Sequence, residues 1–378
     1  MPSRKPMRDS KESECLPPGN YISEWFGQRL FPIVRMDVRE LIGEGFGNCP
    51  FLSEALRQSS RCIKNENSLG VCTINTASNG VPQDWLACPY RVISSDLVKV
   101  ACASIFGKTG DDISQTIPAT LLSVASERER FKAEVSAKGA GVVFFQAKLG
   151  GEISVISSPR SPEISFDVTL VEVLPASGSF KLGRYGIFEI QTMDFHGSYR
   201  AAVGNLKDAL RLHRAHFSDS LKANMKWAAE GVEGPNIANV FKRTFYQILL
   251  KFQLSGKGAA AGTVLAIPQA VWDSWQPFLG APELLELDDG TYRIKPIDGF
   301  PASLEPTNSY ICVFDLDAGA DAPVSPLNVK AFIRVNAEEL SHHAFKEVPA
   351  GMLKSLNESD SILARIKERL ASYWPELA

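Results

Sequence analysis

The feature of this 378-residue chain that most constrains its fold is an apolar segment, residues 186–191, that reads Gly-Ile-Phe-Glu-Ile-Gln. Such a composition is typical of a β-strand. Because side chains alternate between the two faces of a strand, Glu189 and Gln191 share one face. Phe188 and Ile190 then point to the opposite, core side. A carboxylate in such apolar surroundings is costly unless a partner or a metal ion compensates its charge.

Two further acidic residues precede this strand. Asp167 lies in a second β-rich segment, 164–171, and residues 179–183 provide a turn between the two strands. Antiparallel pairing across that turn would bring Asp167 within metal-sharing distance of Glu189. Glu152 follows the Gly150–Gly151 turn and is near enough in sequence to complete a pocket of three carboxylates.

Such a pocket suits one kind of chemistry. Phosphodiester cleavage needs a divalent cation to polarise the phosphate and to lower the pKa of an attacking water. Mg²⁺ prefers carboxylate and carbonyl oxygen over nitrogen or sulfur. The short pattern is also common in purely structural strands, so by itself it leaves both interpretations open.

The remaining segments predict a mixed α/β core. Val142–Phe145 is a candidate buried strand, and residues 284–294 predict a hairpin around Asp289–Gly290. Further strands are expected at 264–267, 309–314 and 331–335, and helices at 198–216, 236–254, 269–279 and 355–373. Residues 48–89 are rich in turn formers, so this segment is expected to have little core of its own.

The pattern Asp167 … Glu189-Ile190-Gln191 resembles the D…(D/E)xK motif of the PD-(D/E)xK nucleases, with glutamine where lysine is usual. Longer stretches resemble the NotI-like group of type II restriction endonucleases, and the resemblance runs from about Tyr21 to Trp374. The stretches that carry it are 148–152, 188–199, 233–236 and 241–247.

The resemblance implies a restriction-endonuclease-like mixed sheet flanked by helices, with a small N-terminal cysteine-rich metal-binding module. The expected division is a disordered tail at 1–20, a cysteine-rich region at 21–105, and a nuclease core with DNA-recognition elements at 106–378.

The resemblance also assigns roles to the site residues. Asp167 and Glu189 would bind Mg²⁺, Glu152 would complete the acidic pocket, and Gln191 would take the place of the lysine. A neutral glutamine neither supplies positive charge nor takes a proton, so base work falls to a carboxylate or to a metal-bound hydroxide. Phe166 stands where a proline often precedes the motif aspartate. His196 is a second candidate base, although a structural histidine is the more common case at a strand-to-helix junction.

Four of the seven cysteines, Cys49, Cys62, Cys72 and Cys88, are separated by 12, 9 and 15 residues. This spacing lacks a CxxC pair and fits four buried free thiols as well as a metal site. The resemblance implies a structural iron held by the four thiolates, and zinc would suit the same ligands. Cys15 is assigned to the tail, and Cys102 and Cys312 to the core.

Lys242 and Arg243, in the predicted helix 236–254, and Arg200, in the helix before it, are candidate DNA contacts. A solvated helix face is the alternative for these side chains. The resemblance implies a homodimer that cuts double-stranded DNA and leaves 5′-phosphate ends. The implied recognition site is a GC-only palindrome with a CGGCCG core, of which GCGGCCGC is a longer version. A cognate DNA methyltransferase would protect host DNA in such a restriction–modification system.

The composition of the chain excludes few classes of function. The formal net charge of −3 does not advertise a nucleic-acid partner, but phosphate binding needs only local basic patches. No apolar run approaches the length of a membrane span, and residues 1–14 lack the apolar centre of a signal peptide, so a cytoplasmic location is expected. A non-cleaving DNA-binding protein of the same fold and a repair or junction nuclease are the alternative functions.

Overall fold

The computed structural model describes residues 16–31, 47–78, 81–93, 97–108, 116–156, 163–193, 195, 197–296, 308–317, 322, 324–352 and 362–375. Cys15 and His196, both singled out above, lie outside these residues. Among the helices that the structure describes, none is long and apolar enough to cross a membrane.

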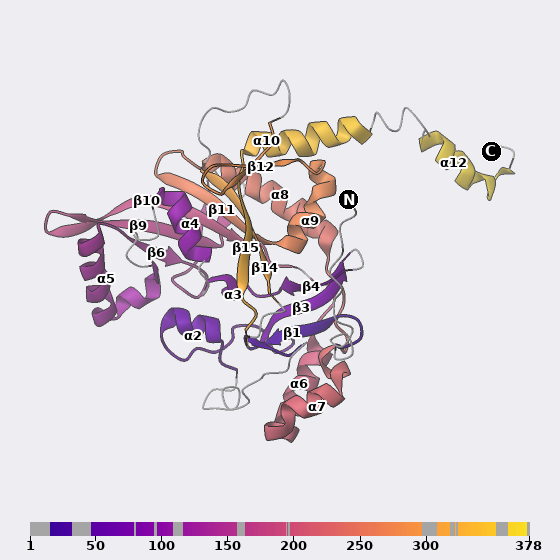
Figure 1. Cartoon of the computed structure of the whole chain (residues 1–378), viewed down its shortest axis with the longest axis horizontal. Helices are drawn as coiled ribbons and strands as arrows, with labels where there is room; N and C mark the ends of the chain where they lie inside the picture. The colour runs from indigo at the N-terminus through magenta and orange to yellow at the C-terminus, as the bar shows by residue number, and fades with distance from the viewer. Residues whose placement is uncertain are drawn as a thin grey trace, which may run out of the picture.

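A nine-stranded mixed sheet forms the centre of the molecule, in the order β12-β13-β15-β14-β11-β10-β9-β6-β5 (Figure 1). Its strands are β5 (Thr116–Pro118), β6 (Gly141–Phe145), β9 (Val168–Ala176), β10 (Ser179–Ile190), β11 (Ala260–Pro268), β12 (Leu284–Glu286), β13 (Tyr292–Ile294), β14 (Ser309–Leu316) and β15 (Leu327–Arg334). The predicted mixed α/β architecture, a sheet flanked by helices, is confirmed.

Helices cover both faces of this sheet, and this burial explains why the sequence of β11 is apolar throughout. Val264 and Ala266 join the core beneath α4 (Leu97–Phe106), whereas Leu265 and Ile267 join the core beneath α8 (Ile237–Leu254). α9 (Gln269–Leu279) and α10 (Ala337–His342) pack on the same side as α8. A strand buried on both faces reads as a continuous apolar run rather than an alternating one.

The pairing of β9 with β10 is antiparallel, as predicted, with Phe188 opposite Val168. β10 is longer than expected, because residues 179–183 belong to the strand and the chain turns at residues 177–178 instead. Gly178 has a φ of 72°, the left-handed conformation that glycine adopts most readily, so the tight turn forms there. Several helices, the last of which is α8, separate β10 in the chain from β11, which runs parallel to it.

A second sheet of four strands, in the order β2-β1-β3-β4, contains the N-terminal region. Its strands are β1 (Tyr21–Trp25), β2 (Gln28–Arg29), β3 (Val71–Ser78) and β4 (Val81–Leu86). Ile74 and Trp85 are fully buried, so this segment does contribute to a core. Sequence turn signals did not reveal that this sheet shares its core with helices more than a hundred residues away.

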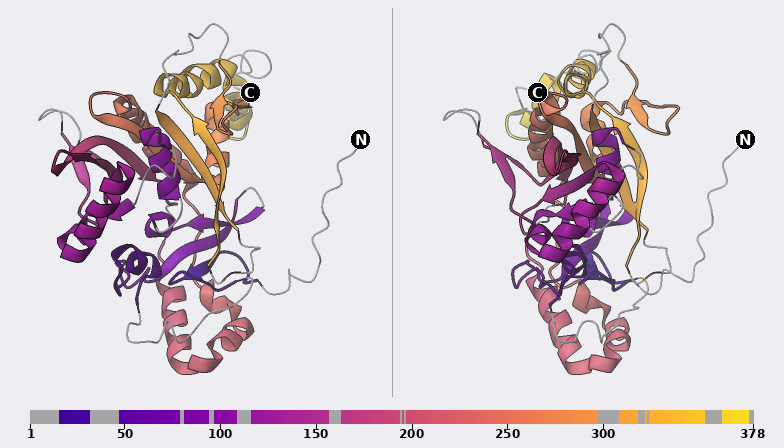
Figure 2. Two further views of the ribbon diagram at one scale, coloured as in Figure 1. Left: turned by 60° about the vertical axis from the view of Figure 1, so that its left-hand side comes forward. Right: turned by 90° about the vertical axis from the view of Figure 1, so that its left-hand side faces the viewer.

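Those helices are α6 (Arg200–His213) and α7 (Phe217–Ala223), which lie below the small sheet and away from the large one (Figure 2). Trp25 stacks on Phe217 with their ring centroids 6.4 Å apart. The predicted helix 198–216 corresponds to α6 and the 3-10 turn that follows it, at which Arg214 has a φ of 34°. α7 begins at the next residue, Phe217, and was not predicted.

The two sheets are joined by a buried polar network. Arg91, in α3 (Tyr90–Ile93), donates from Nε to Oε2 of Glu24 over 3.1 Å, and the Ser325 amide donates to Oε1 of Glu24 over 3.0 Å. Arg29 donates to the Ser325 hydroxyl over 3.2 Å and to the Asp317 carbonyl over 3.0 Å. Each of these charges is satisfied by a partner far away in sequence, so the network ties the two sheets together.

Candidate active site

Asp167 and Glu189 are brought together by reciprocal hydrogen bonds between neighbouring chain segments. The Asp167 amide donates to Glu189 Oε1 over 3.2 Å, and the Ile190 amide donates to Asp167 Oδ2 over 3.0 Å. Asp167 was predicted to lie inside a strand. It lies instead at the bend between β8 (Ile164–Phe166) and β9. The bend frees its amide from the sheet ladder and allows that amide to reach Glu189.

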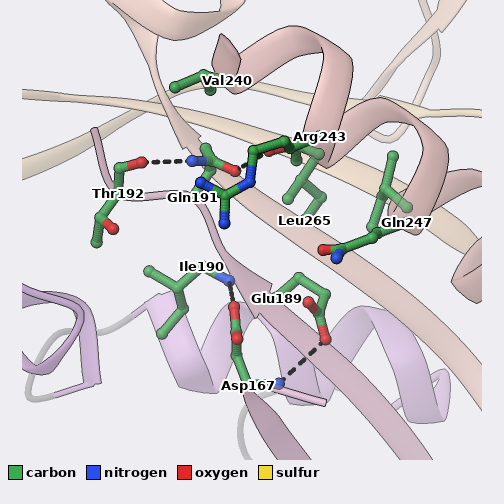
Figure 3. A pocket seen from close by; sticks show the side chains of 11 residues that line it. Asp167, Glu189, Ile190, Gln191, Thr192, Val240, Arg243, Gln247 and Leu265 are labelled. Atoms are coloured by element: carbon green, nitrogen blue, oxygen red, sulfur yellow. Dashed lines mark hydrogen bonds between the residues drawn. The ribbon is translucent and has the colours of Figure 1, made fainter. Parts of the chain in front are cut away.

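Glu189 and Gln191 lie on the sheet face that α8 covers, and Phe188 and Ile190 face the opposite core, as the alternation predicted. The Gln191 side chain accepts a hydrogen bond from the Thr244 hydroxyl and donates to the Thr192 carbonyl. Both ends of the amide are therefore held. Gln191 occupies a fixed orientation beside α8 rather than pointing at the carboxylates (Figure 3).

A cavity of about 200 Å³ opens over these side chains (Figure 3). It is lined by Asp167, Glu189, Ile190, Gln191, Thr192, Val240, Arg243, Thr244, Gln247, Ile248 and Leu265. Two acids, a cation and several amides and hydroxyls thus share one space. A polar cavity of this kind suits a hydrated ligand.

Lys251 is a site residue that the sequence analysis missed. Its Nζ forms an ion pair with Glu189 Oε2, and the side chains of both residues are buried. The ammonium also lies 5.9 Å from the ring centroid of Phe166. A signal was present in the sequence, because Thr244, Gln247 and Lys251 follow at helical spacing and would share one face of α8.

The electrostatic state of Glu189 follows from this environment. The pKa of its carboxyl is raised to about 7, mainly by burial and then by the negative charge of Asp167, while the Lys251 ammonium lowers it. Near neutral pH the group therefore exists in both forms. A carboxyl poised in this way, inside a cavity, is a common feature of functional sites.

Glu152 is exposed and does not line the cavity. It immediately precedes β7 (Ile153–Val155), whose Ile153 pairs with Phe166 in antiparallel register. One step further along that register lies Asp167. The backbone therefore brings Glu152 next to Asp167, but the side chain is not part of the cavity that Asp167 and Glu189 share.

The three basic candidates for DNA contact lie at different distances from the cavity. Arg243 lines the cavity and is exposed to solvent, whereas its neighbour Lys242 is exposed and outside the lining. Arg200 is exposed at the first position of α6. Of the three, Arg243 is the one that a bound phosphate next to the carboxylates would meet.

The four cysteines of the predicted metal site come from separate segments: Cys72 lies in β3, Cys88 follows β4, and Cys49 and Cys62 precede β3. Cys49 caps α2 (Pro50–Leu56), where the Leu52 amide donates to its Sγ over 3.4 Å, and the Gly27 amide donates to Cys72 Sγ over 3.3 Å. The pKa of Cys49 is raised to about 11, mainly by burial and to a smaller extent by charge on Cys88 and Cys62, against the lowering effect of the Leu52 amide. Electrostatic influence thus connects Cys49 with the other three cysteines and Cys88 with Cys62 and Cys72. Cys102 and Cys312 are buried elsewhere in the core, as predicted.

The donor types at both places fit the metals that the sequence suggested. Two carboxylates suit Mg²⁺, which usually takes one or two protein carboxylates and keeps several waters. Four cysteine sulfurs suit iron or zinc, and the amide donors to Cys49 and Cys72 would stabilise their thiolates. Over the part of the chain that the structure describes, however, no three His, Cys, Asp or Glu side chains are placed around a common point as metal ligands.

The chain matches no protein-family model. No curated protein sequence matches it either.

Proposed function

We propose that this chain is a type II restriction endonuclease, which cuts double-stranded DNA by metal-assisted hydrolysis. The observation that supports the proposal best is that backbone amides hold both acids in place beside a polar cavity lined by Arg243: the Asp167 amide donates to Glu189, and the Ile190 amide donates to Asp167. Two acids fixed in this way on neighbouring chain segments offer a divalent cation a preorganised pair of ligands.

Asp167 and Glu189 would hold Mg²⁺, which when bound polarises the phosphate and lowers the pKa of the attacking water. The chain's own side chains have the other tasks. Gln191 cannot take a proton, and its amide, fixed by Thr244, can only orient a ligand by hydrogen bonds. Arg243, at the mouth of the cavity, offers a charged donor to a DNA phosphate or a base edge.

The further assignments belong to the same proposal. Glu152 would approach Asp167 when DNA is bound, since the backbone already brings the two together. Cys49, Cys62, Cys72 and Cys88 would hold a structural iron, or zinc, and Lys242 and Arg200 would contact the DNA backbone. The protein would act in the cytoplasm as a homodimer on a GC-only palindrome with a CGGCCG core, and a cognate DNA methyltransferase would protect host DNA.

A non-cleaving DNA-binding protein is the second candidate, and one observation favours it. Glu189 is already neutralised by Lys251, and a carboxylate with an internal partner does not need a metal ion. The two candidates differ in a single property, the hydrolysis of DNA.

The test is a digest of methylation-free plasmid DNA containing CGGCCG sites, with Mg²⁺ or with EDTA, followed by sequencing of the ends. Wild-type protein should give discrete Mg²⁺-dependent fragments that share one palindrome and carry 5′-phosphates, and the Glu189→Ala variant should give none. An uncut plasmid that the protein nevertheless binds would establish the non-cleaving candidate instead. Mg²⁺-dependent cutting at branched junctions alone would point to a junction nuclease.

A further inference from the structure

Lys251 is placed where a cation bound to Glu189 would be. It extends from α8 two turns beyond Thr244, the residue that fixes Gln191. The side chains of Lys251 and Thr244 therefore both reach the end of β10 from one face of α8. Its Nζ contacts Glu189 Oε2, and only 5% of the residue is exposed. The Thr263 hydroxyl donates to the Lys251 carbonyl over 3.2 Å, which anchors this turn of α8 to β11.

The two oxygens of Glu189 have different partners. Oε1 accepts from the neutral Asp167 amide, whereas Oε2 is bonded to the charged ammonium. A divalent cation that bound this carboxylate would meet a positive charge already in contact with it. Like charges at such short separation repel strongly in a buried site, so the ion pair must loosen before the metal ion is held well.

We infer that Lys251 is the built-in counter-ion of the Asp167–Glu189 site and competes with the divalent cation for Glu189, so that it sets the metal affinity of the protein. The inference rests on the proposed function, because it takes these two acids as the metal ligands. Lys251 thereby keeps the acids in place in the metal-free protein and keeps their affinity for Mg²⁺ low.

The test is a calorimetric titration of Mg²⁺ into the metal-free, full-length protein, at a pH alkaline enough to keep Glu189 ionised. Lys251→Gln removes the charge but keeps an amide donor for the carboxylate. We expect this variant to bind Mg²⁺ about tenfold more tightly than wild type, or more, since a contacting charge has been removed. Its melting temperature should be lower without Mg²⁺ and should rise more than that of wild type when Mg²⁺ is added.

Two variants serve as controls. Lys251→Arg keeps the charge and should keep the wild-type affinity. Lys257→Gln removes an exposed lysine just beyond the same helix and should also leave the affinity unchanged. If Lys251→Gln does not fold, Lys251→Met, whose apolar chain can pack near the Phe166 ring, takes its place in the titration.

The outcomes separate this inference from the proposed function. A folded Lys251→Gln with unchanged or weaker Mg²⁺ binding, beside a wild type that binds Mg²⁺ and cuts DNA, overturns the inference and leaves the function intact. Absence of Mg²⁺ binding in wild type and variant alike, with no cutting, overturns both.

Discussion

At the scale of single residues, Glu189 is controlled by opposing forces. Burial and the charge of Asp167 favour its neutral form, and the ammonium of Lys251 favours its ionised form. The result is a carboxyl whose pKa is about 7, so its charge changes close to neutral pH. Its neighbours in the chain, Phe188 and Ile190, give no hint of this balance, because both Asp167 and Lys251 are distant in sequence.

Glu189→Gln should remove cleavage while leaving the fold and DNA binding in place. Glutamine can still accept from the Asp167 amide and from Lys251, but it cannot ionise to bind a divalent cation. We expect at least about a 100-fold loss of the cleavage rate, since even outer partners of a metal site contribute 10–100-fold. Plasmid nicking assays give the rate, and a gel-shift assay gives the DNA affinity. Normal cleavage by this variant would refute the site.

The stability of the metal-free protein should respond to pH through the same group. Between the ordinary carboxyl pKa of 4.5 and the folded value of about 7, the folded state holds a proton that the unfolded chain has released. The contribution of Glu189 to stability therefore falls as pH rises across this window and is constant above it. The size is on the order of 3 kcal/mol.

Urea unfolding of wild type and Glu189→Gln between about pH 4.5 and pH 8 measures this effect as the difference between the two proteins. Wild type should lose more stability than the variant over this range. Glu152→Gln, at an exposed carboxyl, is the matched control and should follow the wild type. Parallel curves for wild type and Glu189→Gln would contradict the assignment.

At the scale of secondary-structure elements, the sequence predicted what depends on local periodicity. The alternation in β10 correctly separated Glu189 and Gln191 from Phe188 and Ile190, and the predicted helix 236–254 agrees closely with α8, Ile237–Leu254. The true turn before β10 was missed because Ser179, Lys181 and Gly183 are residue types typical of turns, although they also occur in a strand that extends beyond the core.

What the sequence did not predict at this scale depends on contacts between elements. Lys251 joins the site only because the parallel pairing of β10 with β11 brings α8 across Glu189. Glu152 remains outside the cavity because β7 and β8 form a separate two-stranded sheet, whose existence the Gly150–Gly151 turn did not reveal. The helical spacing of Lys251 placed it on one face of α8 but did not show that this face covers Glu189, and the pairing of β7 with β8 leaves no periodic pattern in the chain.

The cysteine cluster is a second case in which pairing, not spacing, decides the outcome. Cys49 caps α2, Cys72 lies in β3, and Cys88 follows β4. The pairing of β3 with β4 brings Cys72 and Cys88 near each other. Cys62 is half-buried, whereas the other three are buried. Because these residues come from separate elements, their spacing in the sequence contains no CxxC pair that would have indicated a metal site.

Cys62→Ser should lose the bound metal and lower the melting temperature. Because Cys62 is the least buried of the four, serine there disturbs packing little, so a fall of several degrees would report the lost metal. Elemental analysis of the purified protein measures the iron and zinc content. Cys102→Ala, at a fully buried thiol outside the cluster, should keep the metal. A Cys62→Ser protein with wild-type metal content and melting temperature would rule out the thiolate site.

At the scale of the whole molecule, the two sheets are joined by Glu24, Arg91, Arg29 and Ser325. The mixed α/β class was predictable because it depends on the kinds of element in the chain. The contact between Glu24 and Ser325, about 300 positions apart, was not predictable, because a buried polar network has no local signature in the sequence.

Glu24→Gln should lower the free energy of unfolding by about 3 kcal/mol, because removing one partner of a buried pair leaves the other charge uncompensated. Arg91 would be that charge, and only 4% of it is exposed. Urea denaturation measures the loss. Glu66→Gln is the control: Glu66 pairs with Lys207 but its side chain is 85% exposed, so the effect should be small. Equal effects of the two substitutions would show that the network adds no stability.

The tight turn at Gly178 has a practical consequence. Glu189 and Gly178 lie at opposite ends of one strand arm, about 35 Å apart at the usual rise per residue. Sequence added at the turn would extend away from the cavity, and the register of β9 and β10 near Glu189 is set by pairs at the other end. The hairpin tip is therefore a suitable place for a fluorophore or a surface tether, through which single molecules could be followed on DNA without altering the site.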